Sequence, residues 1–174
     1  MLVHCFSPLF SLSLKGPALN QWFVPLPFSF HPGRCKMKRF LFAFIAGFIA
    51  VLVFHQGMLT ILHAVGFTSR APFPIQSTQP FGIPQIWSLA FWGGVWGLIF
   101  AAFFRSPARG GKFWLGAILF GAIGPTLAAW FVAAPLKGQA LAAGWKLAPM
   151  ITGLLVNGAW GLGTGLFLRW FSGK

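Results

Sequence analysis

The chain contains no acidic residue: neither aspartate nor glutamate occurs among its 174 positions. Without a carboxylate there is no Ser-His-Asp triad and no glycosidase acid/base pair. Carboxylate-built calcium or magnesium sites, Asp-dependent phosphoryl transfer and transport that runs on a membrane-buried carboxylate are excluded in the same way. The only two cysteines, Cys5 and Cys35, have no metal-binding spacing and form no disulfide framework. The sequence therefore predicts neither an enzyme nor a metal site.

Charge is scarce as well, at 7% of residues, whereas soluble domains carry about 25%. Hydrophobic residues make up 57% of the chain, and its mean hydropathy is +0.77. The net charge of +13 comes from Lys and Arg scattered between long apolar runs, which is not the clustered basic face of a nucleic-acid-binding protein. We therefore predict an integral membrane protein whose partner is the lipid bilayer and not a nucleic acid.

Four apolar segments are long enough to cross a bilayer, whose core of about 30 Å needs roughly 20 helical residues. They lie at about residues 40–63, 85–104, 113–134 and 147–168. An open sheet cannot cross lipid because its edges would be unpaired. We expect Pro135 to end the third span and Pro149 to lie in the first turn of the fourth. The predicted fold class is an all-α integral membrane protein with four transmembrane helices.

Residues 1–36 differ from the rest because they hold both cysteines and five of the prolines. Met37-Lys38-Arg39 then leads directly into an apolar run, which is typical of the start of a bacterial inner-membrane protein. Two interpretations stay open. Either Met37 is the initiator and residues 1–36 are absent from the native protein, or they form a poorly structured extension. Mass spectrometry of the native N-terminus distinguishes them.

The distribution of Lys and Arg near the span ends predicts the orientation. Nine lie on one side, namely Arg34, Lys36, Lys38, Arg39, Arg105, Arg109, Lys112, Arg169 and Lys174, against Arg70, Lys137 and Lys146 on the other. This excess places both termini in the cytoplasm and the protein in the bacterial inner membrane. Tryptophans favour the membrane–water interface, and we expect Trp87, Trp130 and Trp145 at the outer one.

The second and fourth spans repeat a pattern at a constant offset of 64 residues. Gly94-Val-Trp-Gly-Leu98 matches Gly158-Ala-Trp-Gly-Leu162, and Phe103 and Arg105 match Phe167 and Arg169. The alternative is a chance recurrence in a chain rich in Gly and Trp. We interpret the match as duplication of a two-helix hairpin, with a pseudo-two-fold axis along the membrane normal. The first and third spans align only loosely, through Gly57 and Gly124.

Small residues four apart give these helices a smooth face. Such a face favours helix packing, since apolar side chains gain little by leaving lipid for one another, whereas close backbone contact is favourable. The expected packing positions are Gly93, Gly97, Gly153, Gly161 and Gly165.

Polar residues inside the spans are few, and their burial in lipid marks them as candidates for a site. They are His55, Gln56, Thr60, His63, Thr126 and Asn157. Either they line a polar interior, or they make hydrogen bonds that fix helix register. We expect the Gln56 face of the first helix to turn inward near Asn157 or Thr126. Val51, Phe54 and Met58 should then face lipid.

Haem is not expected as a cofactor. Axial ligation from two sides needs histidines on facing helices. Both intramembrane histidines, His55 and His63, lie on the first span, so a single protomer cannot supply them from opposite sides.

The run Phe54-His-Gln-Gly57, a Pro-rich loop and Ser88-Leu-Ala-Phe-Trp-Gly-Gly resemble small inner-membrane proteins of proteobacteria of unknown function. The similarity covers about Met37 to Lys174, and it implies an inner-membrane location without implying a site. Two function classes stay open. The first is a structural or accessory protein that associates with a second copy or another membrane protein. The second is a small channel or carrier for an anion or a neutral solute.

Overall fold

The computed structural model describes residues 32–79, 81–104 and 110–173. Four helices in this part of the chain are long and apolar enough to cross a membrane, which confirms the predicted all-α, four-span fold. The first span joins α1 (Pro32–Ala50), a π-helical turn η2 (Val51–His55) and α2 (Gln56–Ala64). The second span is α3 (Gln85–Phe103), and the fourth is α6 (Leu147–Phe171).

The third span joins α4 (Gly111–Ala128), a second π-helical turn η3 (Ala129–Ala133) and α5 (Ala134–Leu136). The expectation that Pro135 ends this span was wrong, because the helix runs on to Leu136. Proline lacks the amide that would donate to Phe131. The turn before it widens instead, and the amide of Ala134 donates to the carbonyl of Ala129. Local π turns of this kind let proline persist in membrane helices.

The connections that precede α3 and α6 contain short elements of secondary structure. The antiparallel strands β1 (Ser77–Thr78) and β2 (Ile83–Pro84) precede α3, and η4 (Leu141–Trp145) precedes α6. Of the predicted N-terminal extension, residues 1–31 lie outside the described residues. Pro32 to Lys36 belong to α1, so the first helix begins ahead of Met37.

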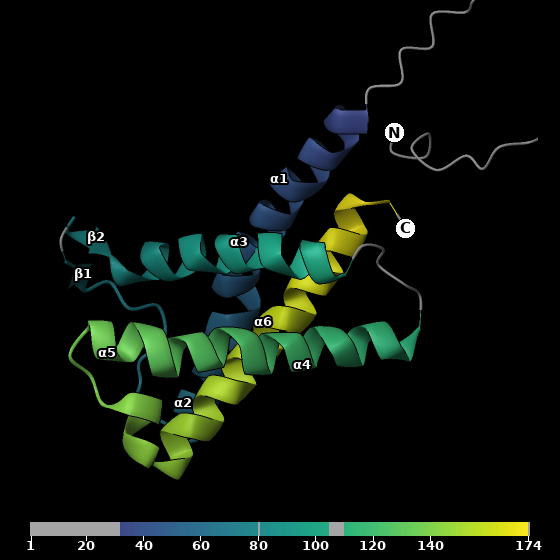
Figure 1. The fold of residues 1–174 in the computed structure, drawn as a ribbon. Coiled ribbons are helices and arrows are strands. Elements are labelled where there is room, and N and C mark those ends of the chain that lie inside the picture. The colour runs from purple at the N-terminus through teal and green to yellow at the C-terminus, as the bar shows by residue number, and fades with distance from the viewer. Residues whose placement is uncertain (1–31, 80, 105–109, 174) are drawn as a thin grey trace, which may run out of the picture.

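In the fold, α3 packs on α1 and α4 packs on α6, while the first span also lies against α6 (Figure 1). The start of α1 and the end of α6 lie toward one end of the bundle, and β1, β2 and α5 lie toward the other (Figure 1). The chain thus forms two helical hairpins that meet mainly through their first and last helices.

Equivalent residues form the contact inside each hairpin. A Cβ added to Gly47 in α1 would lie 3.0 Å from the Cα of Gly97 in α3. A Cβ added to Gly121 in α4 would lie 2.7 Å from the Cα of Gly161 in α6. Gly97 and Gly161 are partners in the 64-residue repeat, so the two hairpins use the same face at the same position.

The first helices of the two hairpins also share their irregularities. Each contains one π-helical turn in its second half, η2 in one and η3 in the other. Each is followed, two residues beyond its last helical residue, by a glycine with positive φ, Gly66 at 72° and Gly138 at 64°. Beyond these glycines, the amide of Phe67 donates to Leu62 and that of Gln139 to Ala134, which satisfies carbonyls at the helix end. These features support the duplication, with Gly47 matching Gly121 in place of the expected Gly57 and Gly124.

The two sides of the bundle are built differently. The first span contacts α6 closely, whereas α3 and α4 meet through large side chains. Phe120 of α4 lies with its ring centroid 5.5 to 6.1 Å from those of Trp96, Phe100, Phe103 and Phe104 of the preceding hairpin. These aromatic side chains hold the two helices apart, so the pseudo-two-fold symmetry is only approximate.

Candidate functional site

All five predicted packing glycines lie where helices meet, but they belong to two interfaces. Gly93 and Gly97 face α1, and a side chain on Gly97 would collide with the carbonyl of Ala43. A side chain on Gly161 would collide with the carbonyl of Ala117 in α4. Gly153 lies near Thr126 and Trp130, and Gly165 lies near Phe113 and Ala117.

Trp160 occupies the junction of three helices. Its side chain is buried, and its Nε1–H donates to the carbonyl oxygen of Gly47 at 2.9 Å. A Cβ on Gly93 would lie 3.2 Å from Trp160 Nε1, so the absence of a side chain there gives the indole access to α1. The sequence marked Trp160 only as part of the repeat, and no residue-type pattern pointed to a backbone carbonyl as its partner.

Asn157 and Thr126, both predicted as polar interior residues, contact each other between the third and fourth spans. The side-chain amide of Asn157 donates to Thr126 Oγ1 at 2.9 Å, and that hydroxyl donates to the carbonyl of Gly153 at 3.3 Å. Thr126 is buried and Asn157 is half-buried. Both hydrogen bonds connect α6 to α4. Together they fix the register of α6 on α4.

Gln56 is fully buried, but its partners are not in the bundle centre. Its Oε1 accepts a hydrogen bond from the backbone amide of Phe73 at 2.8 Å, and its Nε2 lies 3.4 Å from His55 Nδ1. Gln56 therefore binds the loop between the first two spans. The prediction of an interior partner at Asn157 or Thr126 was wrong, because those two residues bond to each other.

Thr60 and His63 do not line an interior. Both side chains are exposed. The Thr60 hydroxyl donates to the carbonyl of Gln56 one turn earlier, and His63 Nδ1 lies 3.1 Å from the carbonyl of Thr68. The six predicted polar residues thus separate into a group near the loop between the first two spans and a pair between α4 and α6.

The prediction that Val51, Phe54 and Met58 face lipid was wrong for Val51 and Phe54, whereas Met58 is partly exposed. Val51 is buried against α3, and Phe54 packs on Gly163 of α6. The prediction assumed about 100° per residue throughout, whereas the π turn at 51–55 holds one more residue per turn and shifts the faces that follow. Val53 and Ile61 are exposed in their place.

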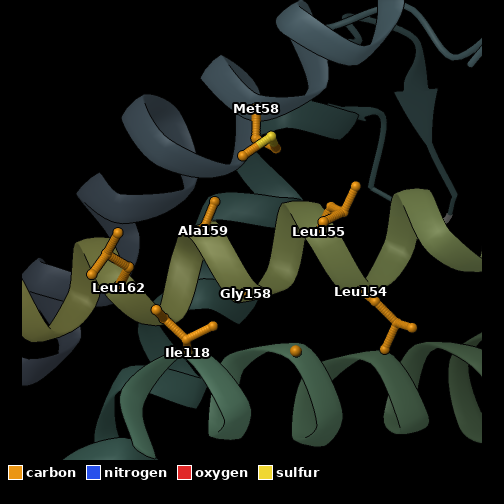
Figure 2. A pocket seen from close by; sticks show the side chains of 8 residues that line it. Met58, Ile118, Leu154, Leu155, Gly158, Ala159 and Leu162 are labelled. Carbon is orange, nitrogen blue, oxygen red and sulfur yellow. The ribbon is translucent and has the colours of Figure 1, made fainter. Parts of the chain in front are cut away.

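A shallow groove of about 350 Å³ runs along α6, between Met58 of α2 and Ile118 of α4 (Figure 2). Gly158 and Ala159 form its floor, and leucines of α6 form its sides. All eight residues that line the groove are apolar. It therefore offers a hydrocarbon surface and no group that would orient a polar substrate.

Arg39 makes a contact that sequence reasoning missed. Its guanidinium donates to the carbonyl of Phe104 at 3.0 Å and also to that of Ala101. These carbonyls end α3 and lack helical partners, and a cation is favourable at a helix C-terminus. Arg39 was expected only as a topology charge, and the structure gives it a role in capping.

The part of the chain that the structure describes holds no cluster of three or more potential metal ligands. No family model, curated protein or solved structure matches the chain.

Proposed function

We propose that the chain is a structural or accessory protein of the bacterial inner membrane, acting through contacts with lipid or with another membrane protein. The observation that carries this proposal is the hydrogen bonding of the protein's buried polar side chains. Across the described residues, every buried side-chain nitrogen and oxygen has a hydrogen-bond partner. Binding sites direct a few polar groups toward a ligand, whereas here Asn157, Thr126 and Gln56 bond within the chain.

Close packing supports the same proposal. The α1–α3 and α4–α6 contacts bring backbone against backbone at Gly47, Gly97, Gly121 and Gly161, which leaves no room for a water-filled path through either hairpin. A selective pore needs a lining of carbonyls, charges or a hydrophobic constriction around a lumen. The surface groove along α6 has none of these polar groups.

The proposed orientation, with both termini in the cytoplasm, is supported by where the charges lie. Arg39 in the first half of α1 bonds to the end of α3, and Arg169 near the end of α6 lies 5.9 Å above the ring of Trp114 in α4. These contacts bring the basic flanks to one end of the bundle. Cytoplasmic ends of membrane proteins carry the excess of Lys and Arg.

Flux through liposomes tests the proposal against transport. Purified protein should leave the permeability to chloride and to glycerol equal to that of protein-free liposomes. A selective flux that Asn157→Leu abolishes and Leu162→Phe retains would overturn the proposal. The chain would then be a channel or carrier for an anion or a neutral solute. Crosslinking in native membranes, followed by affinity purification, should recover a second copy or another membrane protein.

A further inference from the structure

The loop between the first two spans displays large apolar side chains. Ile75 is 76% exposed and Phe81 is 82% exposed, and Phe73 and Ile83 are more than two-fifths exposed. Exposed apolar clusters of this kind mark surfaces that bind protein or membrane. We call residues 73–79 and 81–84 the outer hairpin, since they contain β1 and β2.

The outer hairpin is fixed to the helices by backbone hydrogen bonds. Phe73 has a φ of 49°, which non-glycine residues rarely adopt, and its amide donates to Gln56 Oε1. The amides of Gln85 and Ile86, in the first turn of α3, donate to the carbonyls of Gln76 and Pro74, each at 2.9 Å. The hairpin thus caps α3 and satisfies amides that a helix start leaves without partners.

These hydrogen bonds place the hairpin beside the start of α2, well before the end of the first span. Gln56 is the first of nine residues in α2, so Ala64 lies about 12 Å further along the helix axis. The second span is also short. It has 19 residues, about 28 Å, whereas the other three have 25 or more, about 37 Å. The outer hairpin therefore lengthens the second span at the start of α3, toward the same end of the bundle as α5 (Figure 1).

Tryptophan and charge indicate what surrounds the hairpin. Trp87 lies one residue beyond the capped amides and is about half exposed, and exposed tryptophans gather at the membrane–water interface. The segment from Phe67 to Pro84 holds one charged residue, Arg70, and no acid that phosphate headgroups would repel. A water-facing loop would not expose four large apolar side chains at the level of that tryptophan.

We infer that the outer hairpin is inserted in the headgroup–acyl boundary of the leaflet on its side, where Phe73, Ile75, Phe81 and Ile83 contact lipid. Segments with apolar side chains on one side and polar groups on the other bind at this boundary. The partner is the bilayer surface and not a second protein. This inference concerns a surface distinct from the helix contacts on which the proposed function rests, and it holds whatever that function is.

Site-specific fluorescence in liposomes tests the insertion. A chain with Cys5→Ser and Cys35→Ser carries one new cysteine at Ile75 or Phe81, labelled with an environment-sensitive fluorophore. Nitroxide-bearing phospholipids should quench both labels, and aqueous iodide should quench them several-fold less than a label at Gln139 in the other outer loop. A label at Ile123, half exposed near the middle of the third span, gives the response of the hydrocarbon core.

Each outcome decides the inference. Iodide quenching at Ile75 and Phe81 equal to that at Gln139 would show that the hairpin stands in water, and would overturn it. Protection from both iodide and the nitroxide lipids would mean that protein covers the hairpin, which also overturns it. In the Gln56→Leu variant, iodide should gain access to the Ile75 label, because Phe73 loses its acceptor. An unchanged Ile123 label confirms that this variant is still folded.

Discussion

Substitutions of the single residues Gly161 and Gly57 should differ clearly in their effect on stability. A side chain on Gly161 collides with the backbone of α4, whereas a Cβ on Gly57 meets nothing within 4 Å. Gly161→Leu should therefore lower the free energy of unfolding in detergent by about 3 kcal/mol or more, because the overpacked helices must separate. Gly57→Leu and Leu162→Phe should leave thermal unfolding nearly unchanged. Equal stability of Gly161→Leu and Gly57→Leu would contradict the packing face.

The bond from Trp160 to Gly47 permits a second contrast, because the repeat supplies a matched tryptophan. Trp160→Phe removes the buried hydrogen bond, and Trp96→Phe removes an indole that packs on Phe120 and Gly124. Trp160→Phe should cost about 1 kcal/mol more than Trp96→Phe, the net value of one hydrogen bond. Chemical unfolding in mixed micelles measures the difference, and equal losses would argue against a role for the indole N–H.

Sequence could predict some of these residues because spacing carries the information. Glycines four apart indicate a smooth helix face, and the structure places that face at the two hairpin contacts. Spacing could not predict the partner of Gln56. That partner is the backbone amide of Phe73, and every residue except proline has such an amide. The capping role of Arg39 could not be predicted for the same reason, because its acceptors are backbone carbonyls at the end of α3.

At the scale of elements, the π turns make a prediction about deletions. A π turn contains one residue more than an α turn, because its hydrogen bonds join i and i+5. Deleting the exposed residue Val53 should convert η2 into α-helix and keep the faces on either side in register. Deleting Ile45 within α1 should rotate every later face by about 100°. Thermal stability in detergent should be largely retained in the first variant and lost in the second.

The same turns explain which elements the sequence predicts well. Span positions follow from hydropathy and length, so all four lie within a few residues of their expected bounds. The two π turns have no comparable signal, since their residues are apolar like their neighbours. A helical pattern extended across η2 therefore predicted that Val51 faces lipid. In the structure, Val51 packs against α3.

For the whole molecule, the four spans in the described part of the chain put the start of α1 and the end of α6 on one side of the membrane. Reporters that fluoresce only in the cytoplasm should be bright at the C-terminus. Reporters active only outside should work in the loops near Gln76 and Gln139. Reversing the charge balance with added lysines near Gln139 should reduce the cytoplasmic signal. A periplasmic C-terminus in the unaltered chain would refute the orientation.

The contact between Trp160 and Gly47 joins residues 113 positions apart, and it has a consequence for biosynthesis. Each hairpin is complete in its own backbone contact, so the first can form while the ribosome is still translating the second. Only after the fourth helix has entered the bilayer can the indole reach the first. The gene can therefore be split between the two hairpins. The two hairpins, expressed as separate chains, should associate in the membrane and copurify. Trp160→Ala should weaken this association without preventing either half from inserting.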